Sequence, residues 1–262
     1  MKTIIIIPTY NELENLRPLL EAVFSNAPQT DILIVDDNSP DGTGALADSI
    51  ATEDTRVYVM HRAGKLGLGT AYIAGFKYAV EHGYDAAFEM DADFSHDPRY
   101  LPDFLKAIEN ADLVIGSRYI QGGDTPNWSI MRRFISGGGN LFARFMLVGM
   151  SIHDCTAGYR CYRREVLENI DLDSVQSQGY AFQIEMAYRV LTHSFKIVEI
   201  PIIFMDRRVG KSKMSRTIFL EAFSYVLRTR FGKQSKQAAT SAAKMAAYTK
   251  ETRNEVTSGV QQ

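Results

Sequence analysis

Thr3-Ile4-Ile5-Ile6-Ile7-Pro8 is an almost unbroken run of β-branched residues close to the start of the chain. A strand with one face in water alternates apolar and polar residues, so this run predicts a parallel strand that is covered on both faces. Asp31-Ile32-Leu33-Ile34-Val35-Asp36 repeats the pattern, and an amphipathic segment at residues 14–26 connects the two runs. A buried strand, a helix and a second buried strand in this order predict a βαβ unit.

The alternation continues along most of the chain. Further strands are predicted at residues 56–60, 86–90, 112–117 and 196–204, and further helices at 42–50, 70–81, 101–108, 131–148, 180–191 and 218–231. Gly137-Gly138-Gly139 falls inside one of these helices. Because each glycine costs about 1 kcal/mol against alanine, a kink, a break or a close approach of a ligand is expected there. The predicted fold class is α/β, with a mostly parallel, twisted sheet flanked by helices.

Composition and charge narrow the function classes. The 262 residues are 45% hydrophobic and 23% charged, as in an ordinary soluble protein. A net charge of -2 gives no global field that attracts nucleic acid, and no apolar run reaches the roughly 18 residues of a membrane span. No secretory signal is recognised before the first strand, and Cys155 and Cys161 are expected to be free thiols of a cytosolic protein. The histidines are scattered and predict only surface or turn positions.

Glu89-Met90-Asp91-Ala92-Asp93 stands where a buried strand is predicted to meet a loop. Two carboxylates this close raise each other's pKa unless a cation lies between them. A hard divalent metal ion with oxygen ligands removes that cost and binds phosphate oxygens on its other side. The run therefore predicts a metal–diphosphate site, with Asp93 as the first ligand and Asp91 beside it.

Polar residues also follow other predicted strands. In open parallel sheets, ligands bind beyond the carboxyl ends of the strands. The segments at that edge are residues 8–12, 36–42 and 91–93, together with Arg118. Each of these segments alone is also a typical turn, since Asn, Asp, Pro and Gly are turn formers. Four charged strand ends in one crevice favour a ligand site.

One further motif suggests a different cofactor. Gly42-Thr43-Gly44-Ala45-Leu46-Ala47 matches the dinucleotide-binding pattern G-x-G-x-x-A and opens a predicted helix. Six residues, three of them acidic, separate the preceding strand from the first glycine. That segment is too long and too negative for a tight pyrophosphate turn, so NAD binding is not predicted.

Together these motifs resemble those of the family-two inverting glycosyltransferases of the GT-A fold, and among them the dolichol-phosphate (polyprenol-phosphate) mannose synthases. The resemblance is carried by Pro8-Thr9-Tyr10-Asn11-Glu12, Val35-Asp36-Asp37-Asn38-Ser39-Pro40-Asp41-Gly42-Thr43, His61-Arg62-Ala63-Gly64-Lys65-Leu66-Gly67-Leu68-Gly69, Asp91-Ala92-Asp93, Gly116-Ser117-Arg118-Tyr119 and Asp206-Arg207-Arg208-Val209-Gly210-Lys211-Ser212-Lys213-Met214. It implies a GT-A nucleotide-diphospho-sugar transferase domain over residues 1–231. The composition of residues 232–262 predicts a flexible or frayed helical tail.

The resemblance also implies roles for single residues. Donor binding is assigned to Pro8, Tyr10, Glu12, Val35, Asp37, Asp91, Ala92, Asp93, Arg207 and Lys213. Asp91 and Asp93 are the implied ligands of Mg²⁺ or Mn²⁺, and Ser95 stands where some relatives have a glutamine ligand, as a weaker ligand that acts through water. The acceptor phosphate is assigned to Arg118, Arg132 and Ser136, and catalysis to Asp91, Asp93 and Arg118. Surface solvation is the alternative for each arginine, and for Lys65 it is the alternative to phosphate contact.

The implied reaction is an inverting transfer of mannose from GDP-mannose to a polyprenyl (dolichyl) monophosphate. A phosphate monoester has its second pKa near about 6 and is already ionised at neutral pH, so no general base is assigned. Asp91 or Asp154 is the candidate if a base exists. The alternatives are UDP-glucose or another sugar nucleotide as donor, nucleotidyl transfer, and a non-catalytic sugar-nucleotide-binding subunit.

The expected location is the cytoplasmic face of a membrane. Residues 216–231 form an amphipathic pattern that either faces a membrane surface or packs on the sheet. The protein is expected to bind the bilayer peripherally or to use a membrane-spanning partner protein.

Overall fold

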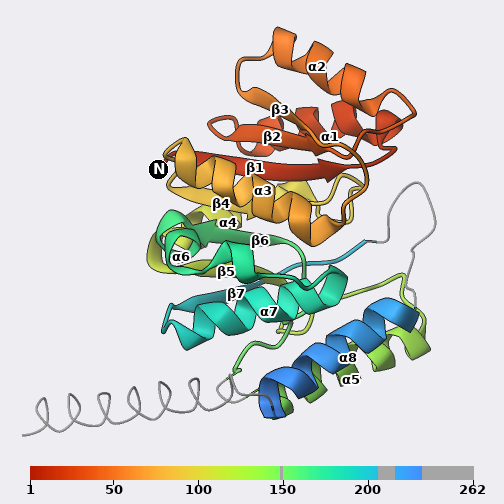
Figure 1. Cartoon of the computed structure of the whole chain (residues 1–262), viewed down its shortest axis with the longest axis vertical. Coiled ribbons are helices and arrows are strands. Elements are labelled where there is room, and N and C mark those ends of the chain that lie inside the picture. Colours follow the sequence, from red (N-terminus) through yellow and green to blue (C-terminus); the bar gives the residue numbers. More distant parts are fainter. Residues whose placement is uncertain (148–149, 206–215, 232–262) are drawn as a thin grey trace, which may run out of the picture.

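The computed structural model describes residues 1–147, 150–205 and 216–231. Within these residues a seven-stranded sheet has the order β3-β2-β1-β4-β6-β5-β7, with helices on both faces (Figure 1). The strands are β1 Thr3–Thr9, β2 Asp31–Asp36, β3 Val57–His61, β4 Ala86–Glu89, β5 Leu113–Ser117, β6 Arg160–Arg163 and β7 Ile197–Pro201. The helices are α1 Leu13–Asn26, α2 Thr43–Glu53, α3 Leu68–Glu81, α4 Leu101–Ala107, α5 Ile130–Met146, α6 Arg164–Asn169, α7 Gly179–Thr192 and α8 Arg216–Phe231. The predicted α/β class with a mostly parallel sheet is confirmed.

Strand β6 and the short helix α6 that follows it are elements that the sequence analysis missed. Strand β6 pairs antiparallel with β4 on one side and with β5 on the other, whereas the other pairings in the sheet are parallel. Its sequence, Arg-Cys-Tyr-Arg, has no apolar run that would mark a strand. Arg160 is nevertheless fully buried, and its guanidinium donates to the backbone oxygens of Ala157, Cys155 and Gln183 at 2.8 Å each. These three carbonyls compensate for the burial of the guanidinium, whereas from the sequence alone an arginine is expected on the surface.

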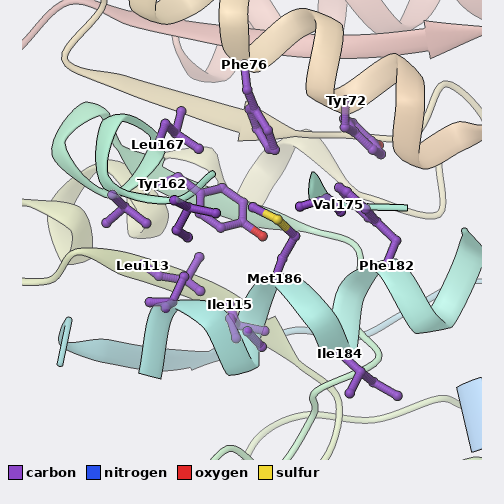
Figure 2. Packing of buried hydrophobic residues seen from close by; sticks show 14 of the residues in the cluster. Tyr72, Phe76, Leu113, Ile115, Tyr162, Leu167, Val175, Phe182, Ile184 and Met186 are labelled. Carbon is purple, nitrogen blue, oxygen red and sulfur yellow. The ribbon is translucent and has the colours of Figure 1, made fainter. Parts of the chain in front are cut away.

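The β-branched run of β1 is buried on both faces, as predicted. Ile5 and Ile7 contribute to the cluster that α1, α2 and α4 cover, and Ile4 and Ile6 to the cluster on the opposite face. Figure 2 shows part of the second cluster, in which side chains of α3 and α7 meet those of β5 and β6. These two apolar layers cover both faces of the sheet, and the parallel pairing of β1, β2, β3 and β4 and of β5 and β7 brings the carboxyl ends of these strands to one edge.

The C-terminal half adds a pair of helices beside this layered core. Helix α8 packs against α7 and α5, and α5 and α8 lie side by side in Figure 1. The rings of Phe142 and Phe223 stack between them at 4.8 Å. Helix α5 runs through Gly137-Gly138-Gly139 without a break, so of the three alternatives expected there the break is wrong. Arg207, Lys213 and the predicted tail at 232–262 lie outside the described residues.

Candidate functional site

The carboxyl ends of β1, β2, β4 and β5 gather at one edge of the sheet, as predicted. Thr9 pairs with Asp36 across β1 and β2, and Ile6 pairs with Glu89 across β1 and β4. The reversed strand β6 begins at the same edge, so the loop that precedes it also reaches the site. Sequence patterns placed the parallel strand ends correctly but gave no sign of this additional loop.

The Asp91–Asp93 loop leaves β4 at the centre of that edge. Asp91 Oδ1 accepts a hydrogen bond of 2.8 Å from the hydroxyl of Tyr72 on α3. Asp93 is buried, and its Oδ1 accepts from the Ser95 amide at 3.0 Å. Ala92 and Ser95 are also buried, which places the predicted metal and donor residues of this run within one tight turn.

The chemistry of this turn fits a hard divalent cation. Each aspartate is held by a hydrogen bond at one oxygen, and carboxylate oxygens are ligands that Mg²⁺ and Mn²⁺ accept. Among the described residues, no three His, Cys, Asp or Glu side chains gather closely enough to hold a metal ion by themselves. A cation at this turn could complete its shell with Ser95, with a bound phosphate compound or with water.

His96 is a site residue that the sequence analysis missed. His96 lies in the turn after β4, but its ring is buried, against the surface position expected for the histidines, and Nδ1 accepts a hydrogen bond of 2.9 Å from the Asp91 amide. Burial lowers the pKa of His96, which favours the neutral ring that this acceptor role requires. The only sequence signal was its place three residues after Asp93.

The predicted nucleoside residues lie at the ends of β1 and β2. Tyr10 is partly exposed, and the Lys65 ammonium lies 4.2 Å from its ring centroid. The Glu12 amide donates to Thr43 Oγ1 at 3.0 Å, which ties this segment to the start of α2. Pro8 is half-buried beside them, whereas Val35 is fully buried in the core, so its side chain supports the pocket from behind.

Asp37 has an ion-pair partner that sequence reasoning missed. Arg62 Nε lies 2.7 Å from Asp37 Oδ1, and both side chains are largely buried. Burial raises the pKa of Asp37, and the Arg62 charge opposes that rise. Arg62 also donates to Thr70 Oγ1 at 3.0 Å. The loop at residues 62–67, before α3, is therefore bound to the predicted nucleoside pocket through Arg62.

Arg118 lies at the end of β5 in a buried ion pair with Asp154. Its Nε and Nη2 donate to the two oxygens of Asp154 at 2.7 Å each, and Nη2 also donates to Thr156 at 2.9 Å. Burial acts to raise the pKa of Asp154, but the Arg118 charge holds it below its usual range. With both oxygens engaged, Asp154 is unsuited to act as a general base.

The other two predicted acceptor residues lie on consecutive turns of α5. The Arg132 guanidinium lies 4.0 Å from the ring centroid of Trp128. Arg132 and Ser136 line a cavity of about 390 Å³ between α5, α7 and α8. Its wall is otherwise mostly apolar and includes Phe134, Ile135, Phe142, Tyr180, Ile184, Phe223 and Val226. Thr156 also lines the cavity, which places the Arg118 pair at its polar end.

An aromatic chain connects the two halves of the site. The Phe204 ring packs edge to face against His96 at 6.3 Å and against Trp128 at 5.7 Å. Trp128 in turn lies against the guanidinium of Arg132. The carboxylate turn and the basic, apolar-walled cavity therefore belong to one continuous site.

Glu89 provides a pH-dependent prediction. The carboxyl is fully buried, accepts a 2.6 Å hydrogen bond from Gln183 Nε2, and has its pKa raised by burial from 4.5 to about 7. Between these values the unfolded state has lost this proton and the folded state keeps it, so the stabilising contribution falls as pH rises from 4.5 to about 7. We expect urea unfolding without added metal ions to show this slope in the wild type and a flatter one in Glu89→Gln. Equal slopes in the two proteins would contradict the assignment.

Comparison with known proteins gives a consistent set of relatives. A model of glycosyl transferase family 2 matches residues 4–171. The undecaprenyl-phosphate mannosyltransferase of Micrococcus luteus is 51% identical over 228 residues, which cover 87% of this chain and 93% of that protein. The polyprenol monophosphomannose synthase of Mycolicibacterium smegmatis is 53% identical over 223 residues, which cover 84% of each protein.

Solved structures share the fold at low sequence identity. The mannosyltransferase PcManGT of Pyrobaculum calidifontis, solved in complex with GDP-Man and Mn²⁺, matches 94% of this chain and 75% of its own with a TM-score of 0.53 and 14% identity. The mannosyl-3-phosphoglycerate synthase of Rubrobacter xylanophilus matches 90% of this chain and 75% of its own with a TM-score of 0.60 and 16% identity. At these identities the likeness is one of fold, and it confirms the predicted GT-A class.

Proposed function

The chain belongs to glycosyl transferase family 2, and from that premise we propose that this glycosyltransferase transfers mannose from GDP-mannose to a polyprenyl monophosphate, with inversion at the anomeric carbon. The observation that carries the proposal is the continuity of the carboxylate turn with the basic, apolar-walled cavity. A nucleotide-sugar site and a lipid-phosphate site are needed side by side in such a reaction. The names of the two curated relatives support a polyprenyl-phosphate acceptor and a mannosyl donor.

The donor half of the site consists of the β1 and β2 ends and the Asp91–Asp93 turn. Tyr10 offers a ring face to the base, and the Asp37–Arg62 pair lies beside the ribose and phosphate positions in this proposal. Asp91 and Asp93 would hold the divalent cation, as supported by the Mn²⁺ and GDP-Man in the structural neighbour PcManGT. The chemistry that such a cation supplies is neutralisation of the departing nucleoside diphosphate.

The acceptor half consists of the cavity and its polar end. Arg132, Ser136 and Thr156 would bind the phosphate, and the apolar wall would cover the first isoprene units. Arg118 is positioned by Asp154 and contributes positive charge at the same end. A phosphate monoester is ionised at neutral pH. The site therefore has to hold the two anions in line and needs no carboxylate base, in agreement with the engaged oxygens of Asp154.

Helix α5 carries a feature that suits a membrane surface. Ile130, Phe134, Leu141 and Phe145 are 86%, 79%, 66% and 84% exposed. At 100° per residue these four positions fall within an arc of about 60°, and we call them the apolar stripe. Arg228 and Arg230 are exposed on the neighbouring helix α8. None of the helices in the described parts of the chain combines the length and apolarity needed to cross a bilayer.

We propose that the apolar stripe enters the headgroup region of the bilayer and brings the cavity to its lipid substrate. Apolar side chains backed by arginines are the pattern of a helix that lies in the membrane interface. Phe134→Glu is expected to lower the partition coefficient onto anionic vesicles about tenfold or more, since it removes a phenylalanine that would be buried in the bilayer and adds a negative charge. Vesicle sedimentation measures this directly.

Gln29→Glu is the matched control for the vesicle experiment. Gln29 is exposed before β2, at the opposite edge of the sheet, and the substitution adds the same negative charge. Its partition coefficient should stay within about twofold of the wild type. Equal loss of binding in both variants, or wild-type protein that binds only when other membrane proteins are present, would contradict direct insertion of the stripe.

The reaction itself is tested with purified protein, Mn²⁺ and vesicles that contain polyprenyl phosphate. The expected result is that label from the sugar of GDP-mannose enters the lipid while label from the guanine stays in solution. Sugar label from UDP-glucose instead would change the donor, and base label in the lipid would indicate nucleotidyl transfer. Absence of lipid label from either donor would overturn the proposed function.

A further inference from the structure

We propose that His96 is a positioning residue that fixes the Asp91–Asp93 turn for its cation by accepting the Asp91 amide hydrogen at Nδ1. This inference rests on the proposed role of Asp91 and Asp93 as cation ligands. It extends that role to a residue that lies three positions beyond the second aspartate and touches neither carboxylate in the described hydrogen bonds.

Where the chain leaves the sheet, the hydrogen bond to His96 takes the place of a hydrogen bond between strands. The Met90 amide still bonds to Ile6 O at 3.2 Å across β1 and β4. The next amide, that of Asp91, bonds to the His96 side chain at 2.9 Å instead of to a strand. Asp91 is half-buried, and an amide shielded from water loses free energy without a partner, so the ring nitrogen holds the turn against reopening into an extended chain.

The turn contains backbone strain that needs such support. Phe94, between Asp93 and Ser95, has a φ of 63°. A bulky residue in the left-handed region persists only where the surrounding contacts determine the backbone. The Asp93–Ser95 hydrogen bond is local to this strained segment, whereas the His96–Asp91 bond closes the turn across it.

The His96 ring is itself fixed from several sides. It stacks on Tyr159 with centroids 4.9 Å apart and planes at 11°, and Phe204 packs against it edge to face. Gly158 allows this stack, because a Cβ there would lie 3.3 Å from His96 Cε1. A ring held in this way offers its nitrogen in one direction, as a positioning residue requires.

The variants His96→Asn and His96→Gln distinguish a hydrogen-bonding role of His96 from a purely steric role. The Asn side-chain oxygen falls where Nδ1 of histidine lies, whereas the Gln amide reaches the position of Nε2. The readout is the Mn²⁺ dissociation constant in the presence of GDP, measured from the free-ion EPR signal. We expect His96→Asn to stay within about threefold of wild type and His96→Gln to bind Mn²⁺ about tenfold more weakly, because only Asn keeps the Asp91 amide bonded.

Steady-state kinetics give a second readout with the same variants. The concentration of Mn²⁺ for half-maximal transfer should rise in His96→Gln, while kcat at saturating Mn²⁺ should change less. His96→Phe keeps the stacked ring without the acceptor and should behave like His96→Gln, which preserves the test if the Gln variant does not fold.

The outcomes distinguish this inference from the proposed function. Equal Mn²⁺ affinity in His96→Gln, His96→Phe and wild type would overturn the positioning role alone. Tighter Mn²⁺ binding in His96→Gln than in His96→Asn would do the same, since side-chain volume would then explain the data. Wild-type protein that binds no Mn²⁺ with GDP would overturn the proposed metal role, and this inference with it.

Discussion

Asp93→Ala is expected to lower lipid mannosylation at least about a thousandfold while the protein stays folded. The lost interaction is the carboxylate contact to a cation that neutralises the departing diphosphate, which is worth several kcal/mol at about 1.4 kcal/mol per tenfold in rate. Asp93→Ala deletes the acceptor of the Ser95 amide, which costs about 0.5–2 kcal/mol, and in the absence of metal the loss of one of two neighbouring negative charges offsets part of that cost. Label counted in extracted lipid measures the rate, and thermal melting checks the fold.

Asp97→Ala is the matched control for this experiment. Asp97 lies four residues further along and pairs with Arg99 at 3.1 Å, while its Oδ1 accepts from the Arg99 amide. Its removal also deletes a carboxylate and a capping hydrogen bond, at a cost of about 0.5–2 kcal/mol in stability. Transfer should stay within about threefold of wild type. An Asp93→Ala enzyme with more than about a tenth of wild-type activity would contradict the metal role.

Much of the fold could be predicted because its signals are local. The four consecutive isoleucines of β1 are buried on both faces, and an apolar run without polar alternation indicates this directly. The position of Asp91 and Asp93 at the sheet edge then follows from the topology of parallel strands, without knowledge of any side-chain contact. Both the buried strand and the position of the two carboxylates could therefore be predicted from short stretches of sequence.

The contacts that shape the site are not local and were missed. Asp154 lies 36 residues after Arg118, and Arg62 lies in a different loop from Asp37. Whether an arginine binds a ligand or a nearby carboxylate depends on which loops meet, and for Arg118 the antiparallel strand β6 brings in the loop that carries Asp154. No periodicity in Arg-Cys-Tyr-Arg predicts such an insertion.

The glycines of α5 show why one of the expected alternatives was wrong. Their low helix propensity predicts a break, a kink or a close approach of a ligand, but there is no break: Ser129 caps the helix at its start by accepting from the Arg132 amide, and the helix packs on α8. A Cβ on Gly138 or Gly139 would meet no heavy atom within 4 Å, and both residues line the cavity. Tertiary packing outweighs propensity here, and the glycines leave open space at the cavity wall.

Asp154→Ala is expected to lower the free energy of unfolding by about 3–5 kcal/mol, because it leaves the buried Arg118 guanidinium without its counter-charge. Arg118 is only 7% exposed and lies among the rings of Tyr119, Trp128 and Phe204, so water replaces the lost carboxylate poorly. Urea unfolding at neutral pH measures the loss. An unchanged unfolding midpoint would contradict the assignment of this pair as a structural contact.

The double variant Arg118→Met with Asp154→Leu separates stability from function at the same place. Replacing a buried ion pair by apolar residues of similar volume is often neutral or stabilising, so we expect most of the lost stability to return. Transfer to the lipid should not return with it, because the Arg118 guanidinium, the proposed phosphate contact at the polar end of the cavity, is gone. Recovery of both would mean that the pair only supports the fold. Recovery of stability without transfer would assign Arg118 to the acceptor phosphate, with Asp154 as the residue that positions it.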